Sequence, residues 1–146
     1  MTDKKAIEEV INSVAHLREL KQWERLSKYF VKKPFVDDRA ISGEMPTNLP
    51  KERLISNWRR EIGSFFYASR HFVKRLAIRL VNSRRAKASA AVEYVHYVAD
   101  RGQRYAWTVR GTVDYILVKT GEDRWKISQL IFRLQDQAVR PLGAAA

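Results

Sequence analysis

The sequence after Phe65 consists almost entirely of strand patterns separated by short turns. The strand-like runs are residues 71–81, 87–98, 104–119 and 124–134, and the turn segments between them are 82–85, 100–103 and 120–123. Consecutive strands joined by such short turns pair antiparallel, because a parallel pair requires a long crossover connection. The chain must therefore fold around one long antiparallel meander.

Helical patterns occupy the first part of the chain. Apolar residues recur at helical spacing over residues 4 to about 20, directly after Thr2 and Asp3, which can cap a helix. A further helix is predicted from Pro50 to near Gly63. Helices followed by a meander predict an α+β domain, with the helices on one face of a curved sheet and a pocket at its open end.

The remaining segments are predicted to be less regular. Trp23, Leu26, Tyr29 and Phe30 indicate a second short helix, which Pro34 must end. Residues 35–41 are then a strand candidate, and residues 42–48 are a loop. Residues 135–146 carry little patterning, so we expect a single domain over residues 1–134 followed by a loose C-terminal tail.

Composition narrows the function classes. The chain has no cysteine, which removes disulfides and thiolate metal sites, and its three histidines lack the spacing of a helical zinc motif. We therefore expect no metal, and the absence of a glycine-rich phosphate loop predicts no nucleotide cofactor. No apolar run approaches membrane-spanning length, so the sequence predicts a soluble, cytoplasmic protein without a membrane partner.

The formal net charge of +12 is large for 146 residues, and it is unevenly distributed. No Asp or Glu occurs between Gly63 and Val92, whereas seven Lys and Arg residues fall in residues 70–87. Such a segment attracts anions weakly and in a salt-dependent way. The alternative is a solvated outer sheet face, and nucleic acid is not the favoured partner because most aromatic residues fall on pocket-facing positions.

Two histidines, His71 and His96, are predicted to face each other across the first hairpin. A two-residue turn at Ser83-Arg84 pairs them directly, with Cβ atoms roughly 5 Å apart. Two imidazoles at such a short distance can share one proton, because a charged ring opposes charging of its neighbour. The pair is a candidate acid–base site; the alternative is two ordinary strand histidines, and a one-residue register change would separate their faces.

Other candidate residues share the face of this histidine pair. If the second turn centres on Arg101 and Gly102, His96 lies opposite Trp107. The predicted substrate-binding residues are Trp58 from the helix before the sheet, Tyr94, Trp107 and Tyr115 from the strands, and Arg75, which could bind an anionic group. Plain core packing is the alternative for the aromatic residues.

Segments 15–26, 36–38, 69–71, 110–119 and 124–127 follow one another in an order that resembles the SnoaL-like branch of the nuclear transport factor 2-like superfamily. The resemblance covers residues 4 to about 134. It implies a cone-shaped fold in which three N-terminal helices pack on a strongly curved, mainly antiparallel sheet that encloses a pocket. It also implies a homodimer formed through the sheet.

Within the superfamily, scytalone dehydratase is the nearest functional match. It resembles this chain in having histidines at the positions of His71 and His96, and its acidic residue near the end of the first helix falls on Glu19. Its two pocket tyrosines fall on Arg18 and Asp38, which are not tyrosines. Hexachlorocyclohexane dehydrochlorinase resembles the chain in the same histidine–acid pairing, and the base of ketosteroid isomerase falls on Asp38.

These observations favour a cofactor-free acid–base enzyme, a dehydratase-type lyase acting on a small hydrophobic or cyclic substrate, and the net charge adds a mild preference for anionic compounds. His71 would be the base, His96 its proton partner, and Glu19 or Asp38 the carboxylate that orients His71. The alternative interpretation of Glu19 is an exposed acid on a helix. The alternative interpretation of Asp38 is an acid close to a turn, neutralised by Arg39. The rival functions are a non-catalytic ligand-binding protein or accessory subunit and, less favoured, an isomerase, an epoxide hydrolase or a nucleic-acid-binding module.

Overall fold

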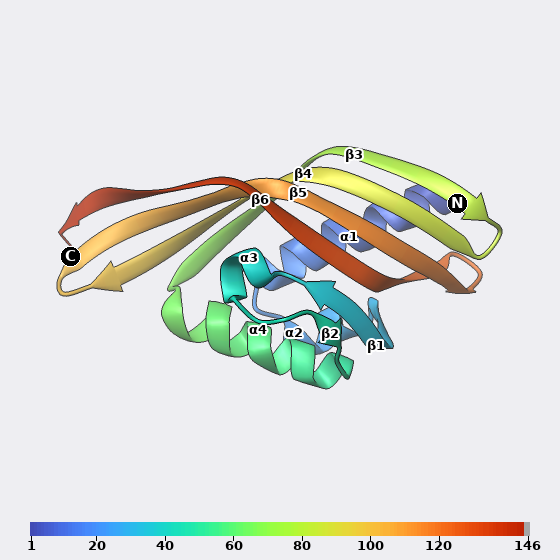
Figure 1. Ribbon diagram of the computed structural model, residues 1–146, viewed down its shortest axis with the longest axis horizontal. Coiled ribbons are helices and arrows are strands. Elements are labelled where there is room, and N and C mark those ends of the chain that lie inside the picture. The colour runs from blue at the N-terminus through green and yellow to red at the C-terminus, as the bar shows by residue number, and fades with distance from the viewer. Residues whose placement is uncertain (145–146) are drawn as a thin grey trace.

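The computed structural model describes residues 1–144 and shows helices packed on one curved, six-stranded sheet (Figure 1). The helices are α1 (Asp3–Glu19), α2 (Trp23–Ser27), α3 (Arg39–Ser42) and α4 (Lys51–Phe65). The strands are β1 (Phe30–Asp37), β2 (Thr47–Asn48), β3 (Ala68–Asn82), β4 (Arg85–Asp100), β5 (Gln103–Gly121) and β6 (Arg124–Ala144). Their order in the sheet is β2-β1-β6-β5-β4-β3, and only β1 and β6 are parallel. The predicted α+β class and mainly antiparallel curved sheet are confirmed.

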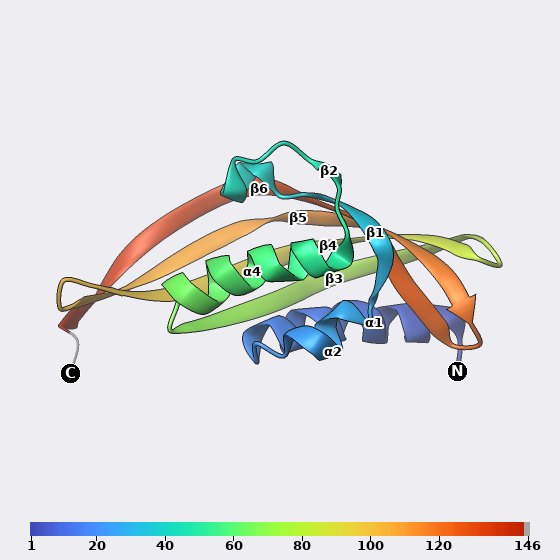
Figure 2. The same ribbon diagram turned by 90° about the horizontal axis from the view of Figure 1, so that it is seen from below.

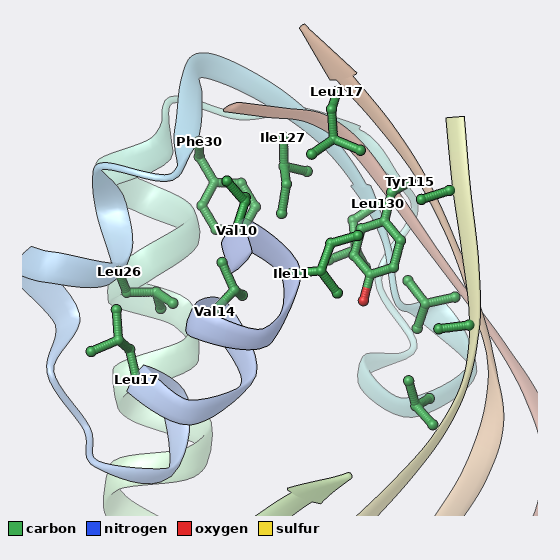
Figure 3. Packing of buried hydrophobic residues seen from close by; sticks show 14 of the residues in the cluster. Val10, Ile11, Val14, Leu17, Leu26, Phe30, Tyr115, Leu117, Ile127 and Leu130 are labelled. Atoms are coloured by element: carbon green, nitrogen blue, oxygen red, sulfur yellow. The ribbon is translucent and has the colours of Figure 1, made fainter. Parts of the chain in front are cut away.

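The long helices lie under the concave face of the sheet, which arches over α4 and α1 (Figure 2). The helix α1 supplies its predicted apolar stripe to the core, and Thr2 caps it, because the Lys5 backbone N–H donates to Thr2 Oγ1 at 3.2 Å. Val10, Ile11 and Val14 pack between α2 and β1 on one side and β5 and β6 on the other (Figure 3). This layer closes one end of the concave face.

The segment around Pro34 differs from the sequence prediction. The helix α2 already ends at Ser27, and Phe30 begins β1, so Pro34 lies inside a strand and does not stop a helix. The ladder between β1 and β6 is interrupted between Phe30 and Phe35, which is where a residue without an N–H can be accommodated. The predicted strand 35–41 stops at Asp37, because the chain then turns into the short helix α3.

The first hairpin has the predicted turn but not the predicted register at the histidines. Asn82 pairs with Arg85, as a turn at Ser83-Arg84 requires. Two irregularities in β3, one next to Asn82 and one after Lys74, each add a residue to β3, so the pairing slips by two positions before it reaches His71. His71 therefore lies opposite Tyr94, and the predicted direct pairing of His71 with His96 is wrong.

The second hairpin keeps the predicted register throughout. Asp100 pairs with Gln103, and His96 lies opposite Trp107. The last strand is longer than predicted: residues 135–144 pair with β5 as far as Ala144 opposite Gln103, so this part of the chain is strand and not a loose tail. Main-chain pairing extends β6 here although its side chains are exposed, which explains the lack of an apolar pattern. Residues 145–146 of the predicted tail lie outside the described residues.

No helix within residues 1–144 is both long and apolar enough to cross a membrane. On the described chain, the ends of β4, β5 and β6 extend beyond the helices on the side of the C-terminus (Figure 1). The concave face is thus covered by helices along only part of its length.

Substitution of Gly111 in β5 tests how closely β5 packs against β6. A Cβ atom at Gly111 would collide with the main-chain oxygen of Arg133 and the ring of Phe132. Gly111→Ala should therefore lower the free energy of unfolding by about 1–3 kcal/mol or more, measured by urea denaturation. Gly63→Ala is the matched control, because its Cβ would meet only ordinary contacts within α4, and it should leave stability unchanged or raise it by up to about 1 kcal/mol. Equal effects of the two substitutions would contradict this packing.

Candidate active site

A cavity of about 450 Å³ lies between the concave face of the sheet and the helices. Its apolar walls come from α3, α4, the residue after α4, and strands β4 and β5: Ile41, Trp58, Ile62, Phe65, Phe66, Tyr94, Val98 and Trp107. Its polar lining residues are Arg18, Asp38, Ser42, Glu61 and His96. An aromatic cavity with a few convergent polar groups is the usual form of a small-molecule site.

The two strand histidines lie next to each other on this concave face. Because the two β3 irregularities together shift the pairing by an even number of residues, His71 stays on the face of His96 as its diagonal neighbour. Their ring centroids are 5.9 Å apart with an interplanar angle of 71°. Both are buried, with 7% of His71 and 5% of His96 exposed. The predicted proximity is thus confirmed through a different register.

His96 is the histidine that lines the cavity. Its Nδ1 lies 2.9 Å from the hydroxyl oxygen of Ser69, which pairs with it across the ladder. Its ring stacks on Phe66, with centroids 4.2 Å apart and an interplanar angle of 15°. Since Ser69 engages Nδ1, Nε2 is the nitrogen left to meet a molecule in the cavity.

His71 lies behind His96 and is not among the cavity-lining residues. Its ring packs edge-on against Tyr94, and within the described chain neither ring nitrogen has a hydrogen-bond partner. Glu19 does reach His71, but its carboxylate accepts from the backbone N–H and not from the ring. Asp38 lines the cavity and accepts a hydrogen bond from the Ser42 hydroxyl at 3.0 Å. The structure thus brings both predicted acids near the site without joining either to the imidazole.

Burial is the main cause of the altered acidity of both histidines. Desolvation, and secondarily the charge of Arg18, lowers the pKa of His96 to about 4. The same two causes, with a smaller contribution from His96, lower the pKa of His71 to about 2. Both imidazoles are therefore neutral near pH 7, which is the state that a general base requires.

The remaining predicted residues divide into two groups. Trp58, Tyr94 and Trp107 line the cavity, as predicted. Tyr115 does not; it is buried in the core beside Ile11 (Figure 3), where desolvation raises its pKa. Arg75 is exposed and has φ of 53° at the irregularity in β3, which breaks the strand alternation that was expected to turn it inward. Arg75 is therefore not a cavity residue.

Four polar residues of the cavity or the histidine pair were not predicted as site residues: Arg18, Ser42, Glu61 and Ser69. Ser69 stands two positions before His71, so strand alternation alone places it on the same face. Glu61 follows Trp58 by three positions on α4, which also puts both on one face. Burial and then the charges of Asp38 and Glu44 raise the pKa of Glu61. Arg18 stands in the sequence only as the position of a pocket tyrosine in the resemblance to scytalone dehydratase, and that resemblance does not assign it a role.

Within residues 1–144, no group of three or more His, Cys, Asp or Glu residues is arranged to hold a metal ion. The polar side chains of the cavity instead combine a neutral imidazole, a guanidinium and two carboxyl groups. Such a set can move a proton and bind a charged or polar group.

Sequence comparison identifies the family. The SnoaL-like domain family matches residues 1–131, which is most of the chain. The chain belongs to the SnoaL-like family. No curated protein matches it in sequence.

Solved structures agree on the fold at low sequence identity. The Kfla4162 protein from Kribbella flavida has a TM-score of 0.85 at 23% identity, with 93% of each chain covered. A protein from Novosphingobium aromaticivorans, described as a candidate scytalone dehydratase, has a TM-score of 0.79 at 20% identity, with 97% of this chain and 90% of that one covered. A LinA-type3 hexachlorocyclohexane dehydrochlorinase from Novosphingobium barchaimii has a TM-score of 0.76 at 14% identity, with 95% and 89% covered. These similarities establish the cone-shaped, nuclear transport factor 2-like fold. The activity has to be inferred from the residues of the site.

The buried histidines predict a specific dependence of stability on pH. Because the pKa of each folded-state imidazole lies below the ordinary value of 6.5, the unfolded chain binds more protons between about pH 4 and 6.5. The contribution of the neutral histidines to the free energy of unfolding should therefore be complete above pH 6.5. It should decrease as the pH falls below 6.5, by about 1.4 kcal/mol per pH unit for each buried histidine.

Urea denaturation of His71→Phe across this range measures the contribution of one imidazole. In this variant the free energy of unfolding should change less steeply with pH, by about the contribution of one histidine, since a phenylalanine side chain cannot bind a proton. His16→Phe is the control, because His16 is exposed on α1. An unchanged pH dependence in His71→Phe would show that His71 binds protons equally well in the folded and the unfolded protein, which contradicts the lowered pKa.

Proposed function

We propose that this SnoaL-like protein is an enzyme that performs cofactor-free acid–base chemistry, a dehydratase-type elimination on a small hydrophobic or cyclic substrate. The observation that carries the proposal is the position of His96, a neutral imidazole in the wall of an aromatic cavity with one ring nitrogen held by Ser69. A base must be within reach of the proton it takes, and His96 meets this condition where His71 does not.

The elimination needs few groups. Nε2 of His96 takes a proton from a carbon next to a carbonyl, and the electron pair of the broken C–H bond forms the new C=C bond. The hydroxyl on the neighbouring carbon leaves with a proton from the imidazolium, so that water departs and His96 returns to its neutral state. Ser69 stabilises the charged intermediate, because its oxygen can accept a hydrogen bond from the Nδ1–H of the imidazolium.

The other proposed residues act around this step. His71 lies directly behind His96 and stays neutral when His96 is charged, since neighbouring positive charges disfavour each other. Glu19 fixes the backbone of His71 and acts as a positioning residue. Asp38 and the rings of Trp58 and Trp107 line the space for the substrate.

Substitution of the histidines tests the proposal against a panel of cyclic β-hydroxy ketones, with formation of the conjugated product followed by absorbance. His96→Ala should lower kcat/KM by on the order of a hundred to ten thousandfold, which is the usual loss for a general base. His71→Ala should cost less, because His71 does not line the cavity. For the wild type, kcat/KM should fall only as the pH approaches about 4, where His96 becomes protonated.

His16→Ala supplies the matched control, because it removes the exposed third histidine and should leave the rate unchanged. Full activity in His96→Ala on a substrate turned over by the wild type would eliminate the proposed mechanism.

One observation favours a second candidate, a binding protein without turnover. Within the described residues no carboxylate contacts a ring nitrogen of either histidine, which is what a packed, non-catalytic pair would show. Exchange of the acidic ring protons of a bound cyclic ketone with solvent deuterium separates the two functions. Exchange that requires His96 supports the enzyme, and tight binding without exchange supports the binding protein.

We also propose a homodimer formed through the outer face of the sheet. Phe72 on β3 is 37% exposed and lies on the face opposite to the neighbouring His71. Light scattering at micromolar concentration should give the mass of a dimer, and Phe72→Glu should shift the protein toward monomer, because it places a charge at an apolar contact. A wild-type monomer under these conditions would disprove the proposal.

A further inference from the structure

Arg18 has an unusual position for a charged side chain. It projects from the C-terminal part of α1 into the cavity, where its guanidinium carbon lies 4.5 Å from the ring centroid of Trp58 and 5.4 Å from that of Tyr94. Contacts of this kind hold a guanidinium over aromatic faces. A guanidinium held in this way can still offer N–H donors at its edge to a bound group.

In the described part of the chain, no carboxylate forms an ion pair with Arg18. Other arginines in the protein do form ion pairs: Arg39 with Asp37 at 3.2 Å and Arg110 with Asp136 at 3.1 Å. Within residues 1–144, Arg18 forms no such pair, and its Nε is buried without a hydrogen-bond partner. Buried charges in proteins are normally paired, because desolvation is costly.

Within the range that the structure describes, neither acid that lines the same cavity forms an ion pair with Arg18. Asp38 accepts the hydroxyl hydrogen of Ser42, and burial, followed by the charges of Asp38 and Glu44, raises the pKa of Glu61 against a smaller opposing effect of Arg18. The histidines are neutral near pH 7, so among the described residues that line the cavity Arg18 carries the positive charge. A planar guanidinium matches a carboxylate in geometry and charge.

We propose that Arg18 binds the carboxylate of the substrate, so that the substrates of this protein are small aromatic or cyclic carboxylates. This inference rests on the proposed function, because it takes the cavity as the substrate site. Arg18 is then the specificity-determining residue, and it takes the anion-binding role that strand alternation assigned to Arg75.

A pair of probes that differ only in charge tests this role. The compounds are 2-naphthoate and 2-naphthamide, and calorimetry measures their equilibrium binding without any turnover. Wild-type protein should bind 2-naphthoate at least about tenfold more tightly than 2-naphthamide, since a charge-assisted hydrogen bond is worth more than a neutral one. Arg18→Met should lose this preference while retaining its affinity for 2-naphthamide, because methionine keeps an apolar contact with Trp58.

Two further variants separate the local role of Arg18 from general effects. Arg75→Met removes the same charge from an exposed position and should keep the full preference. Arg18→Lys retains the charge without the planar fork, so it should keep part of the preference, and it serves as the test if Arg18→Met does not fold.

Three results would overturn the inference: no preference in the wild type, no binding of 2-naphthoate at millimolar concentration, or an equal loss of preference in Arg75→Met and Arg18→Met. The outcome is separable from that of the proposed function. His96→Ala should keep the preference for 2-naphthoate, so a carboxylate preference that depends on Arg18 stands even where no elimination is found. Elimination that depends on His96 with neutral substrates alone supports the function and rejects the role of Arg18.

Discussion

The pairing of β3 with β4 determines where the chemical groups of the concave face lie. Two extra residues in β3 shift the ladder by two positions, so His71 moves from the place opposite His96 to the place diagonal to it, and Ser69 takes the opposite place. A single extra residue would have turned His71 to the outer face. The contact between Ser69 and His96 and the burial of both imidazoles follow from this even shift.

The sequence predicted those features that depend on local pattern. Turn residues and alternation placed all three turns of the meander, and the second hairpin has the expected register at Trp107. The irregularity at Arg75 could not be predicted in this way, because a positive φ is usually marked by glycine and here it falls on an arginine. The face on which Arg75 lies was therefore assigned wrongly, although the face of His71 was correct.

The remaining differences come from long-range pairing. Pro34 reads locally as a helix stop, but β6 offers β1 a parallel partner whose ladder is interrupted at that point. Residues 135–144 lack an apolar pattern, and their strand is set by main-chain pairing with β5. Arg18 lies in the cavity because α1 crosses close to Trp58 and Tyr94, a proximity that no sequence spacing records.

Charge connects the binding and acid–base parts of the cavity. Arg18 contributes to the lowered pKa of His96, so in the free protein it makes His96 a weaker base. An anion bound at Arg18 would offset that positive field and raise the basicity of His96 at the moment when substrate is present. Because burial keeps both histidines neutral near pH 7, they add no further positive charge to the cavity. A site of this kind would couple recognition of the substrate's charge to activation of the base, without a carboxylate attached to the imidazole.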